Sequence, residues 1–195
     1  PFRLIEWNNS FTYGYALVAA VVEAKARRPF PQVVKQQIAG PCAAATLQDD
    51  DVTRIIRGRA QGYVRQDGVL RNSALMDGSY KFGGGGLCAA ADDLVRFAQA
   101  LVAGKLVRAE TLAAMWTRQR TKDGKEIDYA LGFRVDRSDG RLSVSHSGAQ
   151  SRVSTMLWLL PEQRIAVVLL CNLERVSLKP LAQQIAAAVA AAEAK

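Results

Sequence analysis

The last third of the chain constrains its fold most, because four short segments with the composition of β-strands follow one another there. They cover residues 129–136, 140–147, 152–160 and 164–173. The sequences Asp139-Gly140 and Pro161-Glu162-Gln163 stand between pairs of these segments and are typical of tight turns between antiparallel strands. The pattern therefore predicts an antiparallel meander over this part of the chain.

A terminal helix is expected directly after these strands. Residues 181–194 are almost pure alanine, and Leu181, Ile185 and Val189 lie on one stripe that can pack on the sheet. Small and apolar residues at helical spacing predict earlier helices as well. These are expected over residues 13–28, 30–39, 92–103 and 109–116.

Proline and glycine divide the first half of the chain. Pro29 and Pro31 end the first expected helix, and the pair Gly40-Pro41 ends the second. Residues 47–82 are polar and interrupted by glycines, which predicts a long excursion with little core of its own. The four glycines at 83–86 are too flexible for a helix or strand, so we expect a turn or a close approach of two backbones there.

The order of these elements places the chain in the α+β class, with an antiparallel sheet, a terminal helix packed on it and a helical region. Two parts are expected. Residues 1–125 form a helical and loop region, and residues 126–195 hold the antiparallel strands and the C-terminal helix.

Composition and charge exclude several functional classes. The net charge is +8, but Lys and Arg are scattered along the whole chain, so no nucleic-acid partner is expected. No apolar stretch reaches the roughly 18 residues that a membrane span requires. Three cysteines lie far apart, without a Cys-x-x-Cys pair or a neighbouring histidine, which excludes a zinc site of the usual spacing. Accordingly, neither a metal nor a cofactor is expected.

The single histidine of the chain, His146, marks the candidate site. It stands near the end of the second strand segment and is followed by Ser147 and Gly148. A histidine at such a place serves either as a structural hydrogen bonder or as a catalytic acid or base. Gly148 would let a ligand backbone come close, and the backbone N–H of Ala149 could face a developing oxyanion.

Four stretches in order resemble one family. They are YGYALVAAVVE at 13–23, DGSYKFGGGGLCAAADDLVRFAQAL at 77–101, ETLAAMWTRQ at 110–119 and HSGAQSRVSTMLWLLPEQRIAVVLLCNLE at 146–174. Together they are similar to the class C β-lactamase and penicillin-binding-protein-like serine hydrolases, which include esterases, D-amino-acid peptidases and mitochondrial LACTB-like proteins. The resemblance covers nearly the whole chain.

The resemblance implies part of a β-lactamase/transpeptidase-like fold and hydrolysis of a small-molecule or peptide amide or ester through an acyl-enzyme. By this resemblance His146 takes the place of the basic group on the strand that walls the active site. Ser147 takes the small polar position, and Gly148 the position that admits the substrate. The N–H of Ala149 would be one of two oxyanion donors. Members of the family are often periplasmic or secreted.

The family's nucleophile is missing from the sequence. It is the Ser of a Ser-x-x-Lys motif, and none of the serines from Ser10 to Ser177 has a Lys three positions later. We expect that motif, and the first strands of the sheet, ahead of Pro1. The chain would then be one portion of a serine hydrolase. The alternative is a catalytically inactive β-lactamase-like binding or scaffold protein.

The family's Tyr-x-Asn loop is also altered. Alignment from Pro1 places Trp7-Asn8-Asn9 on this loop, whereas alignment back from Gly14-Tyr15 places Ser10-Phe11-Thr12 there. Neither alignment offers a tyrosine in the first position. Tyr13 is close enough to substitute for it, or else is a core aromatic residue at the start of the helix. Asn9 is a candidate for hydrogen bonding a substrate amide.

A sheet without its first strands would expose unpaired backbone N–H and C=O groups along one edge. We therefore expect the isolated chain to be bound to its missing N-terminal half or to form a homo-oligomer.

Overall fold

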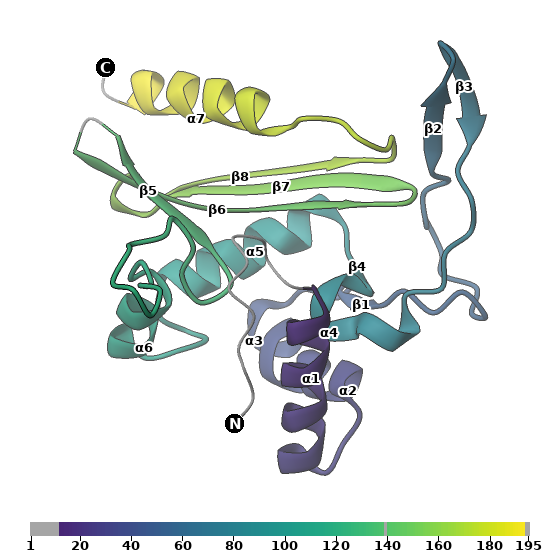
Figure 1. Cartoon of the computed structure of the whole chain (residues 1–195), viewed down its shortest axis with the longest axis horizontal. Helices are drawn as coiled ribbons and strands as arrows, with labels where there is room; N and C mark the ends of the chain where they lie inside the picture. The colour runs from purple at the N-terminus through teal and green to yellow at the C-terminus, as the bar shows by residue number, and fades with distance from the viewer. Residues whose placement is uncertain (1–11, 139, 194–195) are drawn as a thin grey trace.

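A four-stranded antiparallel sheet forms the centre of the computed structural model, which describes residues 12–138 and 140–193 (Figure 1). Its strands lie in the order β5-β6-β7-β8 and span Arg134–Ser138, Arg141–Gln150, Val153–Leu160 and Ile165–Cys171. Each strand pairs with the next one along the chain, so the predicted meander is confirmed. Residues 129–133, expected to begin the first strand, lie in a loop instead. Gly132 has a φ of 83° there, and the N–H of Ala130 donates to the carbonyl of Phe133 at 2.7 Å, which closes a tight turn.

One face of the sheet is covered by α7 (Lys179–Glu193) (Figure 1). Met156 and Trp158 of β7 are buried against Ala182 and Ala186 of this helix. Small alanine side chains allow the helix to approach the bulky residues of the strand closely. The terminal helix thus packs on the sheet as expected.

The opposite face is covered by α5 (Ala91–Val102) (Figure 1). Leu101 of the helix is buried with Val144 of β6 and Leu159 of β7. Because successive side chains of a strand point to opposite faces, β7 contributes to both cores with alternate residues. The result is a helix–sheet–helix sandwich around the middle strands.

The start of α5 is fixed by a buried carboxylate. Asp93 is 3% exposed and accepts hydrogen bonds from the Thr46 amide at 2.6 Å and the Thr46 hydroxyl at 2.5 Å. Arg96, one turn along the helix, forms an ion pair with the same side chain. These hydrogen bonds hold the pKa of Asp93 below its usual range. The helix ends where expected, since Gly104 has a φ of 69°.

A helical layer lies on the α5 side of the sheet (Figure 1). It consists of α1 (Thr12–Ala26), α2 (Phe30–Val34), the π-helical segment η1 (Lys35–Ala39), α3 (Gly40–Cys42) and α6 (Ala109–Met115). The expected helix end at Gly40-Pro41 was wrong, because helical structure continues to Cys42. The N–H of Gly40 donates to the carbonyl of Lys35, and this widened turn accommodates Pro41, which has no N–H to donate.

The polar middle of the chain forms short elements. They are β1 (Gln48–Asp49), β2 (Tyr63–Gln66), β3 (Val69–Asn72), the 3₁₀ turn η2 (Ser79–Lys81), α4 (Phe82–Gly85) and β4 (Leu87–Cys88). A second 3₁₀ turn, η3 (Pro161–Gln163), lies outside this region and connects β7 to β8. The hairpin β2–β3 stands beside the end of the sheet (Figure 1). Its base is attached there through hydrogen bonds of Tyr63 to the backbone at Asn172 and Glu174.

The glycine run was expected to lie outside helices, but its first three residues belong to the single turn α4. The expected close approach is confirmed. A Cβ on Gly83 would lie 2.5 Å from the carbonyl oxygen of Tyr15, so only glycine lets this turn pack against α1.

No helix in the described part of the chain is long and apolar enough to cross a membrane.

Candidate functional site

The second half of β6 is an open strand edge. β5 pairs only with residues 141–145, whereas β7 pairs with residues 144–150 on the other side. Beyond residue 145, none of the strands that the structure describes covers the side away from β7. An exposed edge of this kind offers backbone N–H and C=O groups to an extended ligand. The open edge spans residues 146–150 and so includes the four residues that the sequence singled out, 146–149.

His146 is half-buried where this edge begins, and it contacts Tyr129. Its Nε2 lies 3.2 Å from the hydroxyl oxygen of Tyr129, and the two rings meet edge to face with their centroids 6.2 Å apart. The tautomer of the imidazole decides which of the two groups donates the hydrogen bond. The hydroxyl thus fixes the orientation of the ring beside the open edge.

The surroundings of His146 favour its neutral form. Burial lowers the pKa of His146 below its ordinary value, and the positive charge of Arg134 lowers it further. The Arg134 guanidinium lies 5.9 Å from the centre of the Tyr129 ring and forms an ion pair with Asp128 at 2.6 Å. At neutral pH the imidazole therefore has a nitrogen that can accept a proton, and it carries no fixed positive charge.

The loop that presents Tyr129 is held by backbone hydrogen bonds. The Tyr129 carbonyl accepts from the N–H of Gln119 at 3.2 Å, and the N–H of Leu131 donates to the Met115 carbonyl at 3.3 Å. No local pattern in the sequence marks Tyr129 or Arg134 as site residues. The chain folds back between β5 and β6, and this brings them to His146, which is 17 residues away from Tyr129.

Ser147 and Gly148 lie on opposite faces of β6, since side chains alternate along a strand. Ser147 and Ala149 are exposed, while Gly148 shares the face of His146. A Cβ on Gly148 would come closer than 3.0 Å to the hydroxyl oxygen of Thr155 on β7. Packing against Thr155 therefore requires a glycine here, independently of any ligand.

A second basic group lies at the far end of the open edge. The Lys81 ammonium donates to the Gln150 side chain at 2.9 Å, and the Gln150 amide donates to the Gly85 carbonyl at 3.1 Å. These bonds attach the glycine-rich turn to the end of β6. Sequence reasoning treated this turn as a backbone feature and did not anticipate Lys81.

The loop candidates are only partly described. Asn9 lies outside the described residues, as do Trp7, Asn8, Ser10 and Phe11. Tyr13 lies in the first turn of α1 with its side chain 64% exposed, so the interpretation as a core aromatic residue was wrong. Tyr15, two residues later, is half-buried instead, and its hydroxyl would be 3.6 Å from a Cβ on Gly132, in the loop that begins at Tyr129.

In the portion of the chain that the structure describes, no group of three or more His, Cys, Asp or Glu side chains could hold a metal ion.

A sequence profile of the Beta-lactamase family matches residues 8–190. The chain belongs to the Beta-lactamase family. The mouse mitochondrial serine beta-lactamase-like protein LACTB is 27% identical to it over 215 aligned residues. This alignment includes 90% of the chain and 39% of the mouse protein, so the chain spans about two fifths of the length of that curated relative.

Solved structures show the same β-lactamase/transpeptidase-like fold. A D-stereospecific amidohydrolase from Streptomyces sp. superposes with a TM-score of 0.77 at 18% identity, over 91% of this chain and 54% of that one. A penicillin-binding protein from Bacillus halodurans superposes with a TM-score of 0.74 at 19% identity, over 94% of this chain and 56% of that protein. The resemblance to the β-lactamase-like and penicillin-binding-protein-like serine hydrolases is thereby confirmed.

Proposed function

We propose that the chain forms the strand wall and one proton-transfer group of a serine hydrolase that cleaves an amide or ester through an acyl-enzyme. One observation supports this most directly. The neutral imidazole of His146, oriented by Tyr129, stands beside the open edge of β6. A proton acceptor next to a row of backbone donors is the combination that acyl transfer requires.

In this proposal the substrate lies along residues 146–150 as an added strand. The Ala149 N–H donates to the substrate carbonyl oxygen, and the exposed Ser147 hydroxyl binds a polar group of the substrate. Gly148 has no side chain that could block the substrate on this part of β6. Tyr13, which is exposed in the first turn of α1, and Asn9 are the remaining proposed substrate contacts.

The serine nucleophile comes from a segment outside these 195 residues. Its oxygen forms a bond to the substrate carbonyl carbon while its proton passes to His146. The bond to the leaving amine or alcohol then breaks, and that group takes the proton from the imidazole. Water repeats the same sequence on the acyl-enzyme and releases the acid.

A non-catalytic binding protein is the second candidate, and the absence of Ser-x-x-Lys from this sequence favours it. Such a protein would use the open edge of β6 for a peptide or a protein partner. Both candidates use the same surface, so a binding measurement cannot distinguish them. Covalent labelling of a serine nucleophile can, because only the hydrolase has one.

Intact-mass spectrometry after incubation with a fluorophosphonate ester or a penicillin provides the test. For a hydrolase, the protein from its native source exceeds the 21.2 kDa of this chain and gains one phosphonyl or acyl group. Substitution His146→Gln should slow labelling by about 10²- to 10⁴-fold, whereas Arg65→Gln in the β2–β3 hairpin serves as the matched control. A mass of 21.2 kDa without an adduct would leave the binding protein as the answer.

A further inference from the structure

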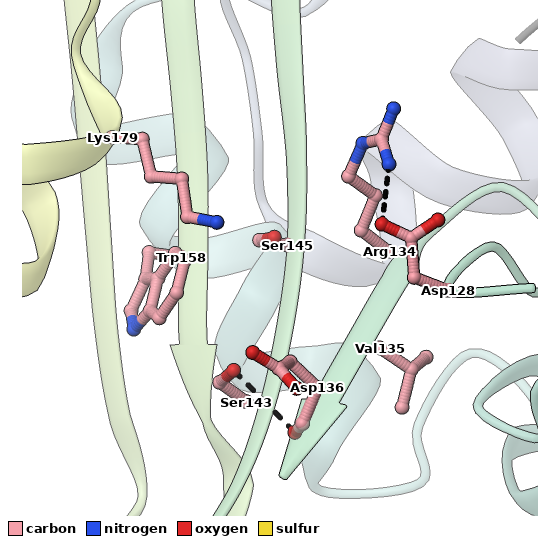
Figure 2. A pocket seen from close by; sticks show the side chains of 8 residues that line it. All are labelled: Asp128, Arg134, Val135, Asp136, Ser143, Ser145, Trp158 and Lys179. Carbon is pink, nitrogen blue, oxygen red and sulfur yellow. Dashed lines mark hydrogen bonds and ion pairs between the residues drawn. The ribbon is translucent and has the colours of Figure 1, made fainter. Parts of the chain in front are cut away.

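The other face of β6 carries a small cavity of about 150 Å³, between β5, β6, β7 and the first turn of α7 (Figure 2). Ser145 and Lys179 line it together with Trp158 and Arg134. Since Ser145 and His146 are successive residues of one strand, they face opposite sides of the sheet. The cavity therefore lies on the opposite side of the sheet from His146, although Arg134 lines the cavity and also lies over the Tyr129 ring. A ligand bound in the cavity does not depend on the proposed hydrolase function.

Ser145 is a largely buried residue that lines the cavity, and its hydroxyl has no hydrogen-bond partner among the described residues. The residue is only 6% exposed. By contrast, the hydroxyl of Ser143, two residues earlier, donates to the Asp136 carbonyl at 3.5 Å. Polar groups in protein interiors are nearly always bonded, so the Ser145 hydroxyl is available to donate to a molecule that enters the cavity.

Lys179 supplies a positive charge that none of the described salt bridges compensates. Its ammonium lies 5.8 Å from the centre of the Trp158 ring, and Figure 2 shows the side chain extending from α7 above this ring on the side of Ser145. None of the acidic side chains that the structure describes pairs with it.

The acidic residues of the cavity are already paired. Asp128 forms its ion pair with Arg134 at 2.6 Å, and Asp136 pairs with Arg118 at 3.1 Å. The positive end of the α7 dipole also lies at this point. The residual charge of the cavity is therefore positive and is concentrated at Lys179.

We propose that this cavity binds a small oxyanion, a carboxylate or a phosphate group, between the Ser145 hydroxyl and the Lys179 ammonium. The hydroxyl donates to one oxygen of the anion and the ammonium to another. A cavity of about 150 Å³ is smaller than the roughly 300–1,000 Å³ of sites for drug-sized ligands, so the group bound is a small ion or the anionic end of a larger molecule.

The test is an NMR titration of the isotope-labelled chain with inorganic phosphate and, separately, with acetate, at constant ionic strength. The amide signals of Ser145 and Lys179 should shift and saturate with at least one of the two ions. Saturation with phosphate alone identifies a phosphate group, with acetate alone a carboxylate, and with both an oxyanion site of low selectivity. Shifts that stay linear in both titrations would overturn the proposal.

Variants locate the site. Ser145→Ala should weaken binding about tenfold, because a hydrogen bond to a charged group is lost. Lys179→Gln, at an exposed position, should have a similar effect and keeps the test available if the buried substitution prevents folding. Ser143→Ala is the matched control, since its hydroxyl already has a partner, and should change affinity less than twofold. Equal affinity in wild type, Ser145→Ala and Lys179→Gln, or an equal loss in Ser143→Ala, would refute the assignment.

Discussion

Substitution of Gly148 by alanine separates two reasons for a glycine at this position. The added Cβ would come closer than 3.0 Å to the hydroxyl oxygen of Thr155, while the Cβ of Thr155 would be at an ordinary 3.6 Å. The overlap is therefore confined to one atom of one side chain. Its relief requires a turn of Thr155 about χ1, which is stiff in a β-branched residue, or a separation of β6 from β7.

We expect Gly148→Ala to reduce the free energy of unfolding by about 1–2 kcal/mol, within the range for overpacked sites and off-rotamer side chains. In a Thr155→Ala background the obstacle is absent, and the same substitution should cost less than about 0.5 kcal/mol. The coupling of about 1–2 kcal/mol between the two positions is the decisive quantity. Urea unfolding followed by far-UV circular dichroism gives the free energy of unfolding of the wild type, of each single variant and of the double variant.

The result that would refute this reasoning is an equal cost of Gly148→Ala in both backgrounds, because Thr155 would then play no part. The double variant also tests the proposed role in catalysis. In the longer protein that also carries the serine nucleophile, it should restore stability without restoring fluorophosphonate labelling if the substrate needs the surface at Gly148 clear. Labelling at the wild-type rate would leave packing as the only reason for the glycine.

Three further predictions concern pH, the α5 cap and the sheet edge. His146 has a lowered pKa in the folded state, so the unfolded chain binds its proton more readily; stability should be full above about pH 7 and fall as pH drops through about 6.5 toward the folded pKa. Denaturant unfolding between pH 5 and 8 should show a slope that His146→Gln reduces; an unchanged slope would contradict this. Asp93→Ala should cost about 2–4 kcal/mol at pH 7, since two hydrogen bonds from Thr46 are lost and their donors are left in a partly buried site. Because the pKa of Asp93 is lowered, the stability it provides is present above about pH 4 and lost as pH falls through the folded pKa, so wild type and variant should converge in acid unfolding. Finally, β8 ends the order of paired strands that the structure describes, and sedimentation should detect self-association of the isolated chain, whereas a single 21.2 kDa species would count against it.

Local patterns determined most of the elements. The last three strand segments, the amphipathic helix before Gly104 and the alanine-rich terminal helix form where the sequence predicts them, whereas the first strand begins only at Arg134. Two predictions of where helices end or are absent were wrong, because contacts with neighbouring parts of the chain changed the local backbone structure. Pro41 is accommodated by a widened turn, and the run at 83–86 enters a helical turn because α1 packs against Gly83.

The sequence by itself also pointed to residues 146–149, through one histidine, one glycine and a family resemblance. Only the tertiary structure placed Tyr129 and Arg134 beside His146 and directed Ser145 and Lys179 into one cavity. It also left the second half of β6, on the side away from β7, without a partner among the described strands. The physical reason is that periodicity and turn chemistry act over a few residues. Contacts between distant residues depend on strand register and on the docking of helices across the sheet, and neither is written in any short stretch of sequence.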